Sequence, residues 1–242
     1  MDASGVSEDA FKISDRTYAY EAFGLSFQEG RLLVIHDEYT LSDTGFEQAP
    51  DAQTFVKNLV QLFSGSWNAN RFLIYSSNAG LLGSRLEQSI TAVRKNTVEK
   101  ISPSTLDLNT LRTYEAVFVG GEPVDNQLLI DYIKLGGSVC LIAGTGHGGS
   151  ESEAAQWNPL LAAFGLRFDP AYNDITGVLP VTSSAHPLFA GVQSLFQYWG
   201  QNIHLLPDSK ASIILTSGSQ GPDRKSTRLN SSHTVISYAV FC

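Results

Sequence analysis

Three consecutive polar residues, His36, Asp37 and Glu38, directly follow a short apolar run at residues 31–35. Two carboxylates and an imidazole can bind a hard cation through oxygen, hydrogen-bond a sugar, or exchange a proton near neutral pH. Adjacent residues on an extended chain point to opposite sides, so the three side chains converge only if a turn follows. The alternative interpretation is a solvated loop, with Asp43 as further surface charge.

A glycine-rich segment at residues 144–149 separates another apolar run from a helical pattern that begins at Glu151. The N–H groups of such a loop can hold an anion. Ser150 and Glu153, however, have the spacing of a capping box, which satisfies the free N–H groups of its own helix. Because Glu151 and Glu153 would also repel a phosphate, we favour a cap and a tight turn over an anion site.

Aromatic side chains late in the chain offer a different chemistry, since an aromatic ring can stack on a sugar. The candidates are Tyr172, Phe196, Tyr198 and Trp199. Packing in the core or against a sheet is the more common role of such residues, and both interpretations stay open.

The elements that must position these residues alternate in type along the chain. Apolar runs predict strands, and apolar residues at three- and four-residue spacing predict helices. The predicted strands lie at 31–35, 72–75, 97–101, 116–119 and 139–143, with one or two more at 17–27 and short ones at 178–181 and 212–215. The predicted helices lie at 51–64, 82–93, 106–111, 124–135 and 151–164, and a loop is expected at 40–50.

This alternation predicts parallel βαβ units with helices on both faces of the sheet. Right-handed crossovers then give an α/β fold with a doubly wound, mostly parallel, flavodoxin-like sheet. Ligands of such sheets bind at the carboxyl ends of the strands. The candidate pocket therefore combines residues that come after three predicted strands: His36, Asp37, Glu38, Gly121, Glu122, Gly144, Thr145, Gly146 and His147.

Two segments, residues 117–123 (Val-Phe-Val-Gly-Gly-Glu-Pro) and 140–147 (Cys-Leu-Ile-Ala-Gly-Thr-Gly-His), carry a family resemblance. Together they resemble the class I glutamine amidotransferase-like superfamily. In its catalytic members one strand ends in Gly-Gly-Pro and the next in a nucleophile elbow of the form Cys-x-Gly-His. Aligned on Gly146 and His147, the nucleophile position falls on Gly144, which has no side chain.

The rest of the catalytic pattern is also absent from the visible sequence. Cys140 lies inside an apolar strand, where a buried thiol is inert packing. The family's general base belongs to a His-x-Glu pair beyond the last strand, and neither His186 nor His204 has that spacing. Residues 157–166 and 184–192 resemble the segments after the elbow strand in uncharacterised bacterial members, so the resemblance implies a non-catalytic branch and spans most of residues 31–205.

The last twenty residues, 223–242, resemble one translated reading frame of a common sequencing-library adapter, residue for residue except at Thr234 and Val235, where the adapter has its variable index. We expect this tail to be non-native and the native protein to continue differently after Pro222. The tail holds three basic residues and one acidic residue, so the formal charge of −8 becomes −10 for residues 1–222. Cys242 also belongs to the tail, which leaves one native cysteine.

Composition narrows the function classes further. The acidic balance and the lack of a clustered basic face argue against nucleic acid as a partner, and no apolar run has the length of a membrane span. Ser, Gly, Asn and Thr outnumber Lys, which is typical of secreted or cell-surface proteins. Nothing in the sequence predicts a cofactor or a metal ion.

The domain prediction is a loose leader at residues 1–16, one α/β domain at 17–222, and the adapter-derived tail. We expect a non-catalytic binding or structural module of a larger bacterial protein, with a small molecule or carbohydrate as ligand. The alternative is a hydrolase, with or without a metal ion, that uses His36 or His147 with Asp37, Glu38 or Glu122. That enzyme needs the histidine within hydrogen-bond reach of a carboxylate in a concave site.

Overall fold

The computed structural model describes residues 17–20, 25–28, 30–64, 70–101, 106–146, 148–181, 185–218 and 235–241. Seven strands form its central sheet, in the order β12-β13-β3-β7-β6-β4-β5. Five of them pair in parallel: β3 (Arg31–Ile35), β4 (Arg71–Tyr75), β5 (Thr97–Ile101), β6 (Ala116–Val119) and β7 (Ser138–Ile142). Strands β3, β6 and β7 are buried along almost their whole length, as their continuous apolar sequences require.

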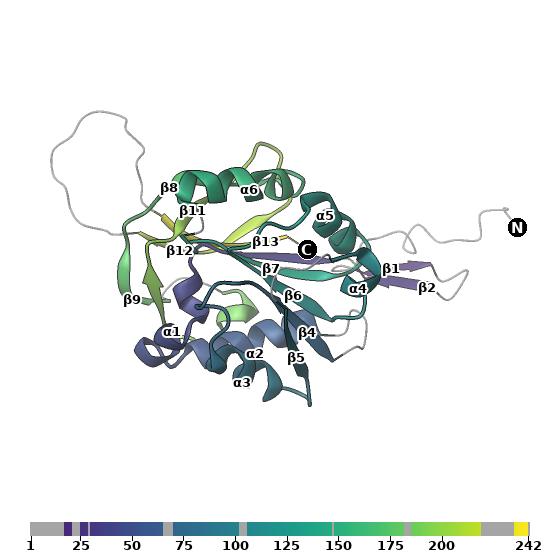
Figure 1. Cartoon of the computed structure of the whole chain (residues 1–242), viewed down its shortest axis with the longest axis horizontal. Coiled ribbons are helices and arrows are strands. Elements are labelled where there is room, and N and C mark those ends of the chain that lie inside the picture. Colours follow the sequence, from purple (N-terminus) through teal and green to yellow (C-terminus); the bar gives the residue numbers. More distant parts are fainter. Residues whose placement is uncertain are drawn as a thin grey trace, which may run out of the picture.

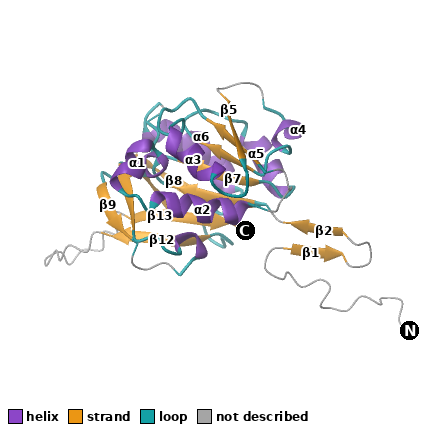
Figure 2. Ribbon diagram, turned by 90° about the horizontal axis from the view of Figure 1, so that it is seen from below, coloured by secondary structure: helices purple, strands orange, loops and turns teal. Residues whose placement is uncertain are grey.

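Helices cover both faces of this sheet (Figures 1 and 2). One face packs against α1 (Asp43–Gln48), α2 (Ala52–Phe63) and α3 (Ser84–Thr91), and the other against α4 (Leu108–Leu111), α5 (Asn126–Lys134) and α6 (Ser150–Ala162). Alternate residues of each strand belong to opposite cores, as with Leu33 and Val34 of β3. The predicted α/β, doubly wound, mostly parallel fold is confirmed.

Three antiparallel pairs lie outside the central sheet. They join β1 (Thr17–Tyr20) to β2 (Leu25–Gln28), β8 (Leu166–Tyr172) to β11 (Gln201–Leu205), and β9 (Thr176–Pro180) to β10 (Ser194–Tyr198). The short helix η4 (Pro187–Phe189) precedes β10. The Thr40 hydroxyl donates to the Phe196 carbonyl at 3.1 Å, which fixes the β9–β10 pair beside the segment after β3.

The loop predicted at residues 40–50 is wrong. The segment forms the 3-10 helix η3 (Glu38–Leu41) and then α1. Asp37 caps η3 by accepting from the Tyr39 N–H, and the Ser42 hydroxyl caps α1 by accepting from the Gly45 N–H. Both elements are too short to show a helical period, so only their caps could have indicated them.

Strand β13 (Val235–Phe241) belongs to the tail that the sequence predicts to be adapter-derived. It pairs antiparallel with β12 (Ser212–Gly218) on one side and with β3 on the other. Strand pairing uses backbone groups that every residue except proline carries. The placement of β13 therefore does not bear on the origin of its sequence.

Candidate functional site

The strand order creates switch points at the carboxyl ends of the parallel strands. The segments after β3 and β4 lead to helices on one face of the sheet, and those after β6 and β7 lead to helices on the other. The neighbouring pairs β3–β7 and β4–β6 therefore have connections that diverge. Crevices at such points are where open α/β sheets bind ligands.

Hydrogen bonds from Asn78 and Ser76 tie the segments after β4, β6 and β7 together. The Asn78 side-chain amide donates to the Thr145 carbonyl at 2.8 Å, and the Ser76 hydroxyl donates to the Gly120 carbonyl at 2.7 Å. Gly121, with φ of 76°, lies against Asn78, where a Cβ would be 3.2 Å from the Asn78 Cβ. A glycine is needed here for its backbone angle and for this close approach.

Asp37 is fully buried at the start of η3. Its Oδ1 accepts from the Tyr39 N–H at 3.1 Å, and its Oδ2 accepts from the Tyr198 N–H at 2.8 Å. Burial raises the pKa of this carboxyl to about 8, against the opposing effect of the backbone N–H groups that it binds. Asp37 thus joins the end of β3 to the end of β10 and keeps a proton at neutral pH.

Glu38 follows Asp37 in the chain, and the buried Glu153 acts electrostatically on both; together the three form what we call the buried acid group. Burial, followed by the charges of Asp37 and Glu153, raises the pKa of Glu38 to about 8. Glu38 is 6% exposed, and its Oε2 has no hydrogen-bond partner among the described residues. This oxygen lies against Gly80: a Cβ added at Gly80 would be 2.6 Å from it.

Glu153 reaches the acid group from α6. Its Oε1 accepts from the Thr145 hydroxyl at 2.5 Å and from the Thr145 N–H at 3.2 Å. The predicted capping box is therefore wrong: Ser150 lies inside α6, the residue at the cap position is Gly149, and no side chain caps the helix. Sequence reasoning found Glu153 but gave it a local role, because the spacing of a capping box cannot reveal a contact with the preceding loop.

His36 is fully buried and lies beneath Gly200, where a Cβ would be 1.9 Å from its Nδ1. Burial lowers the pKa of its imidazole to about 3, although a hydrogen bond with Gln197 acts in the opposite direction. The ring is therefore neutral at physiological pH and shielded from solvent. The expectation of a solvated loop at residues 36–38 is wrong, because all three side chains are buried.

Gly144 lies two residues beyond the end of β7, with φ of 68°, in a tight space. A Cβ there would lie 3.1 Å from the Asp37 Cα, 3.2 Å from the His36 carbonyl oxygen and 3.3 Å from the Gly200 Cα. The fully buried Cys140 lies within β7, and burial raises its pKa well above the usual value. The thiol is thus held in its inert, protonated form.

The remaining predicted site residues lie at the rim. Glu122 is half-buried and accepts a hydrogen bond from the Ser77 hydroxyl, while Thr145 is half-buried and Gly146 is exposed. His147 lies outside the described residues. The structure therefore brings His36, Asp37, Glu38, Gly144 and Thr145 together and leaves Glu122 on the neighbouring loop.

Of the four aromatic candidates, two are exposed side by side. Tyr198 and Trp199 are 39% and 47% exposed, and their rings stack with centroids 5.7 Å apart and planes 9° from parallel. The Tyr39 ring centroid lies 4.7 Å from that of Tyr198. We call Tyr39, Tyr198 and Trp199 the aromatic row. Phe196 contacts Tyr39 at 6.4 Å, and the half-buried Tyr172 has a pKa raised to about 12 by burial and then by the charge of Glu153.

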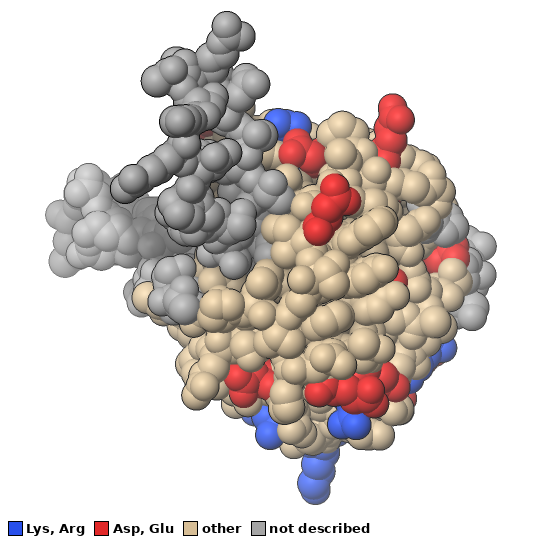
Figure 3. All heavy atoms as spheres, turned by 90° about the vertical axis from the view of Figure 1, so that its left-hand side faces the viewer, with Lys and Arg blue, Asp and Glu red and all other residues tan. Residues whose placement is uncertain are grey.

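The surface around these crevices is poor in charge. Figure 3 shows the side of the molecule on which α1 and β9 lie in Figure 1, where the chain leaves the parallel strands. Uncharged residues make up most of the described surface in this view, acidic side chains stand above and below its middle, and basic side chains lie mainly near its edges.

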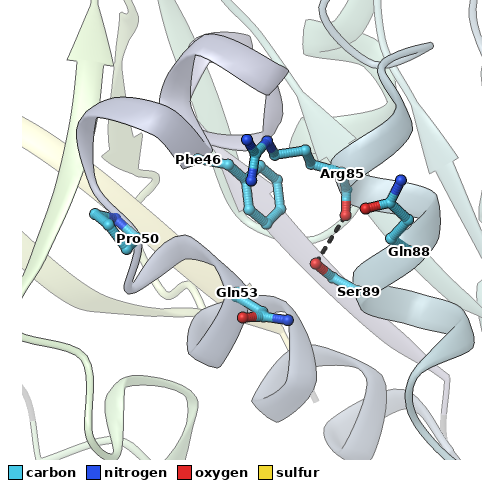
Figure 4. A pocket seen from close by; sticks show the side chains of 6 residues that line it. All are labelled: Phe46, Pro50, Gln53, Arg85, Gln88 and Ser89. Atoms are coloured by element: carbon cyan, nitrogen blue, oxygen red, sulfur yellow. Dashed lines mark hydrogen bonds between the residues drawn. The ribbon is translucent and has the colours of Figure 1, made fainter.

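A separate cavity of about 110 Å³ lies between α1, α2 and α3 (Figure 4). It is lined by Phe46, Pro50, Gln53, Arg85, Gln88 and Ser89, none of which the sequence marked as a site residue. The Arg85 guanidinium faces Glu47 at 3.9 Å, and the Ser89 hydroxyl donates to the Arg85 carbonyl. These contacts engage the side chains of Arg85 and Ser89.

Within the described ranges, no three His, Cys, Asp or Glu side chains are grouped so as to hold a metal ion. No helix in that part of the chain is long and apolar enough to cross a membrane. Comparison with protein-family models, curated proteins and solved structures gives no match. The role of the site must therefore be argued from its own geometry.

Proposed function

We propose that this protein is a non-catalytic binding module whose ligand lies at the carboxyl ends of β3, β4, β6 and β7. The observation that carries the proposal is the Glu38 Oε2 atom, which is buried beside two further carboxyls and has no hydrogen-bond partner among the described residues. An unsatisfied buried polar atom is costly. A ligand that hydrogen-bonds Glu38 would remove this cost.

The absence of a nucleophile supports a role in binding. The resemblance to class I glutamine amidotransferases implies a cysteine at position 144, whereas this chain has a glycine, with φ of 68° and tight contacts at its Cβ position. The thiol of Cys140 is buried four residues earlier. Acyl transfer through cysteine needs an accessible thiolate and a base, and neither His36 nor Cys140 is accessible.

Ligand-observed NMR tests the proposal with a panel of neutral oligosaccharides, polyols, carboxylic acids, amino acids and nucleotides. We expect saturation transfer to at least one compound, its loss in Glu38→Leu, and recovery of the compound unchanged after prolonged incubation. Glu151→Gln, at an exposed position of α6, is the control for removal of one acidic side chain. Absence of transfer to every compound, or transfer that Glu38→Leu leaves intact, would contradict the proposal.

A hydrolase is the second candidate, and one observation favours it. A carboxyl with a pKa of about 8 keeps its proton at neutral pH, as a general acid must. In this alternative Glu38 donates the proton, since His36 is buried and neutral. Conversion of a bound compound to hydrolysis products in the same NMR samples, lost in Glu38→Gln, would establish this function in place of the first.

A further inference from the structure

The backbone of Trp199 has an unusual conformation for an exposed aromatic residue. Its φ is 53°, in the left-handed region that bulky residues rarely adopt. The Trp199 N–H donates to the Ile175 carbonyl at 2.8 Å, and the Asn173 N–H donates to the Gly200 carbonyl at 2.9 Å, so the turn is held on both sides. A glycine would satisfy this turn without strain of about 1–3 kcal/mol. Because its ring is 47% exposed, core packing does not explain the tryptophan.

The aromatic row is joined directly to the buried acid group. Tyr39 is the next residue after Glu38 in the chain, and the Tyr198 N–H donates to the Asp37 carboxyl. The hydrogen bond from Tyr198 to Asp37 therefore places the aromatic row next to the buried acid group at the end of β3.

The charges around this site disfavour an anionic ligand. Among the described residues, the segments that surround it hold no lysine or arginine; they are residues 36–42, 76–83, 120–125, 143–146, 148–149 and 196–202. Their charged residues are acidic, and Glu153 adds a further carboxyl from α6. Arginine and lysine are the side chains that most often bind phosphates and carboxylates in proteins, so this acidic surrounding favours a neutral ligand over an anionic one.

We propose that the ligand is a neutral carbohydrate, one of whose pyranose rings stacks on the exposed Trp199 ring while its hydroxyl groups hydrogen-bond Glu38. This inference rests on the proposed binding function and specifies its ligand. The C–H face of a pyranose ring is apolar and its rim carries hydroxyl groups, which matches an aromatic face beside carboxyl groups. Each carboxyl that retains its proton can both donate to and accept from a hydroxyl.

Titration calorimetry at pH 7 with cellohexaose, chitohexaose, mannohexaose, maltohexaose and xylohexaose tests this inference. We expect at least one to bind, with a Kd raised at least about tenfold by Trp199→Ala. Leu135→Ala is the matched control: Leu135 is also an exposed apolar residue, but it lies at the carboxyl end of α5, away from the site. It should leave the Kd unchanged.

A stability measurement separates binding from structure. Trp199→Gly removes the strained conformation and loses one ring contact, so its free energy of unfolding should stay within about 1 kcal/mol of the wild type. A compound from the NMR panel that Glu38→Leu abolishes but Trp199→Ala leaves bound would overturn the carbohydrate inference and preserve the binding function. Failure of every oligosaccharide to bind also overturns it.

Discussion

Replacement of Glu38 by glutamine should make the protein less sensitive to rising pH. The folded-state pKa of Glu38 is about 8, above its ordinary value of 4.5. Between these values the folded state binds a proton that the unfolded state releases, so the stability that Glu38 contributes falls as pH rises. Each pH unit changes the free energy of unfolding by about 1.4 kcal/mol for one such group. From pH 5 to pH 8 the loss is roughly 3–4 kcal/mol, a large fraction of a typical stability of about 5–15 kcal/mol.

Glutamine has the same shape as the protonated carboxyl but cannot ionise. We therefore expect wild type and Glu38→Gln to have similar stability at pH 5, and the variant to be more stable by roughly 3 kcal/mol at pH 8. Urea unfolding followed by tryptophan fluorescence at pH 5, 6, 7 and 8 measures the difference. Asp37 is present in both proteins, so its own pH dependence largely cancels.

Glu151→Gln removes one acidic side chain from the surface of α6 and serves as the control. If the wild type and Glu38→Gln lose stability in parallel between pH 5 and pH 8, Glu38 is ionised in the folded protein. That result would refute the reasoning from burial.

Three further predictions concern backbone packing. Gly144→Cys should lower the free energy of unfolding, measured in urea, by about 2–4 kcal/mol, because the new side chain adds both backbone strain and close contacts. Gly146→Ala should lower it by only about 1 kcal/mol, because Gly146 has a φ of 73° but no atom within 4 Å of its Cβ position. Gly200→Ala should prevent soluble expression or lower the thermal midpoint strongly, since the alanine Cβ would overlap the His36 ring. A variant that melts at the wild-type temperature would contradict this contact. Deletion of residues 223–242 should cause self-association in size-exclusion chromatography, because β3 would become an exposed apolar edge; an unchanged monomer would show that the β13 pairing does not protect β3.

The fold was predictable because its signals are local. The apolar runs of β3 and β6 have the predicted bounds, since a buried parallel strand needs an uninterrupted apolar sequence. The edge strand β5 also has the predicted bounds, although its sequence is mixed and no residue of it is fully buried. Strands β8, β10 and β11 were not predicted. Their alternating or mixed sequences, such as Gln201–Leu205 with buried Gln201 and Ile203, resemble loop sequence until a partner strand supplies the pairing.

The placement of the candidate site residues at the strand ends was predictable, but their burial was not. Switch-point geometry places His36–Glu38 and Gly144–Thr145 at adjacent strand ends, as the order of strands and helices indicated. Burial of His36 and Asp37 depends on the turn at Trp199 and Gly200, which comes more than 150 residues later in the sequence. No local pattern announces that contact, and the same is true of Glu153, whose partner is the loop before its helix.

Carbon-13 NMR of the Glu38 side-chain carboxyl tests the central claim most directly, with Glu38→Gln used to assign the resonance. We expect a titration midpoint near pH 8 and a change in this resonance when an oligosaccharide that the protein binds is added. A midpoint near the ordinary 4.5, with no response to any ligand that the protein binds, would contradict both the buried acid group and its place in the binding site.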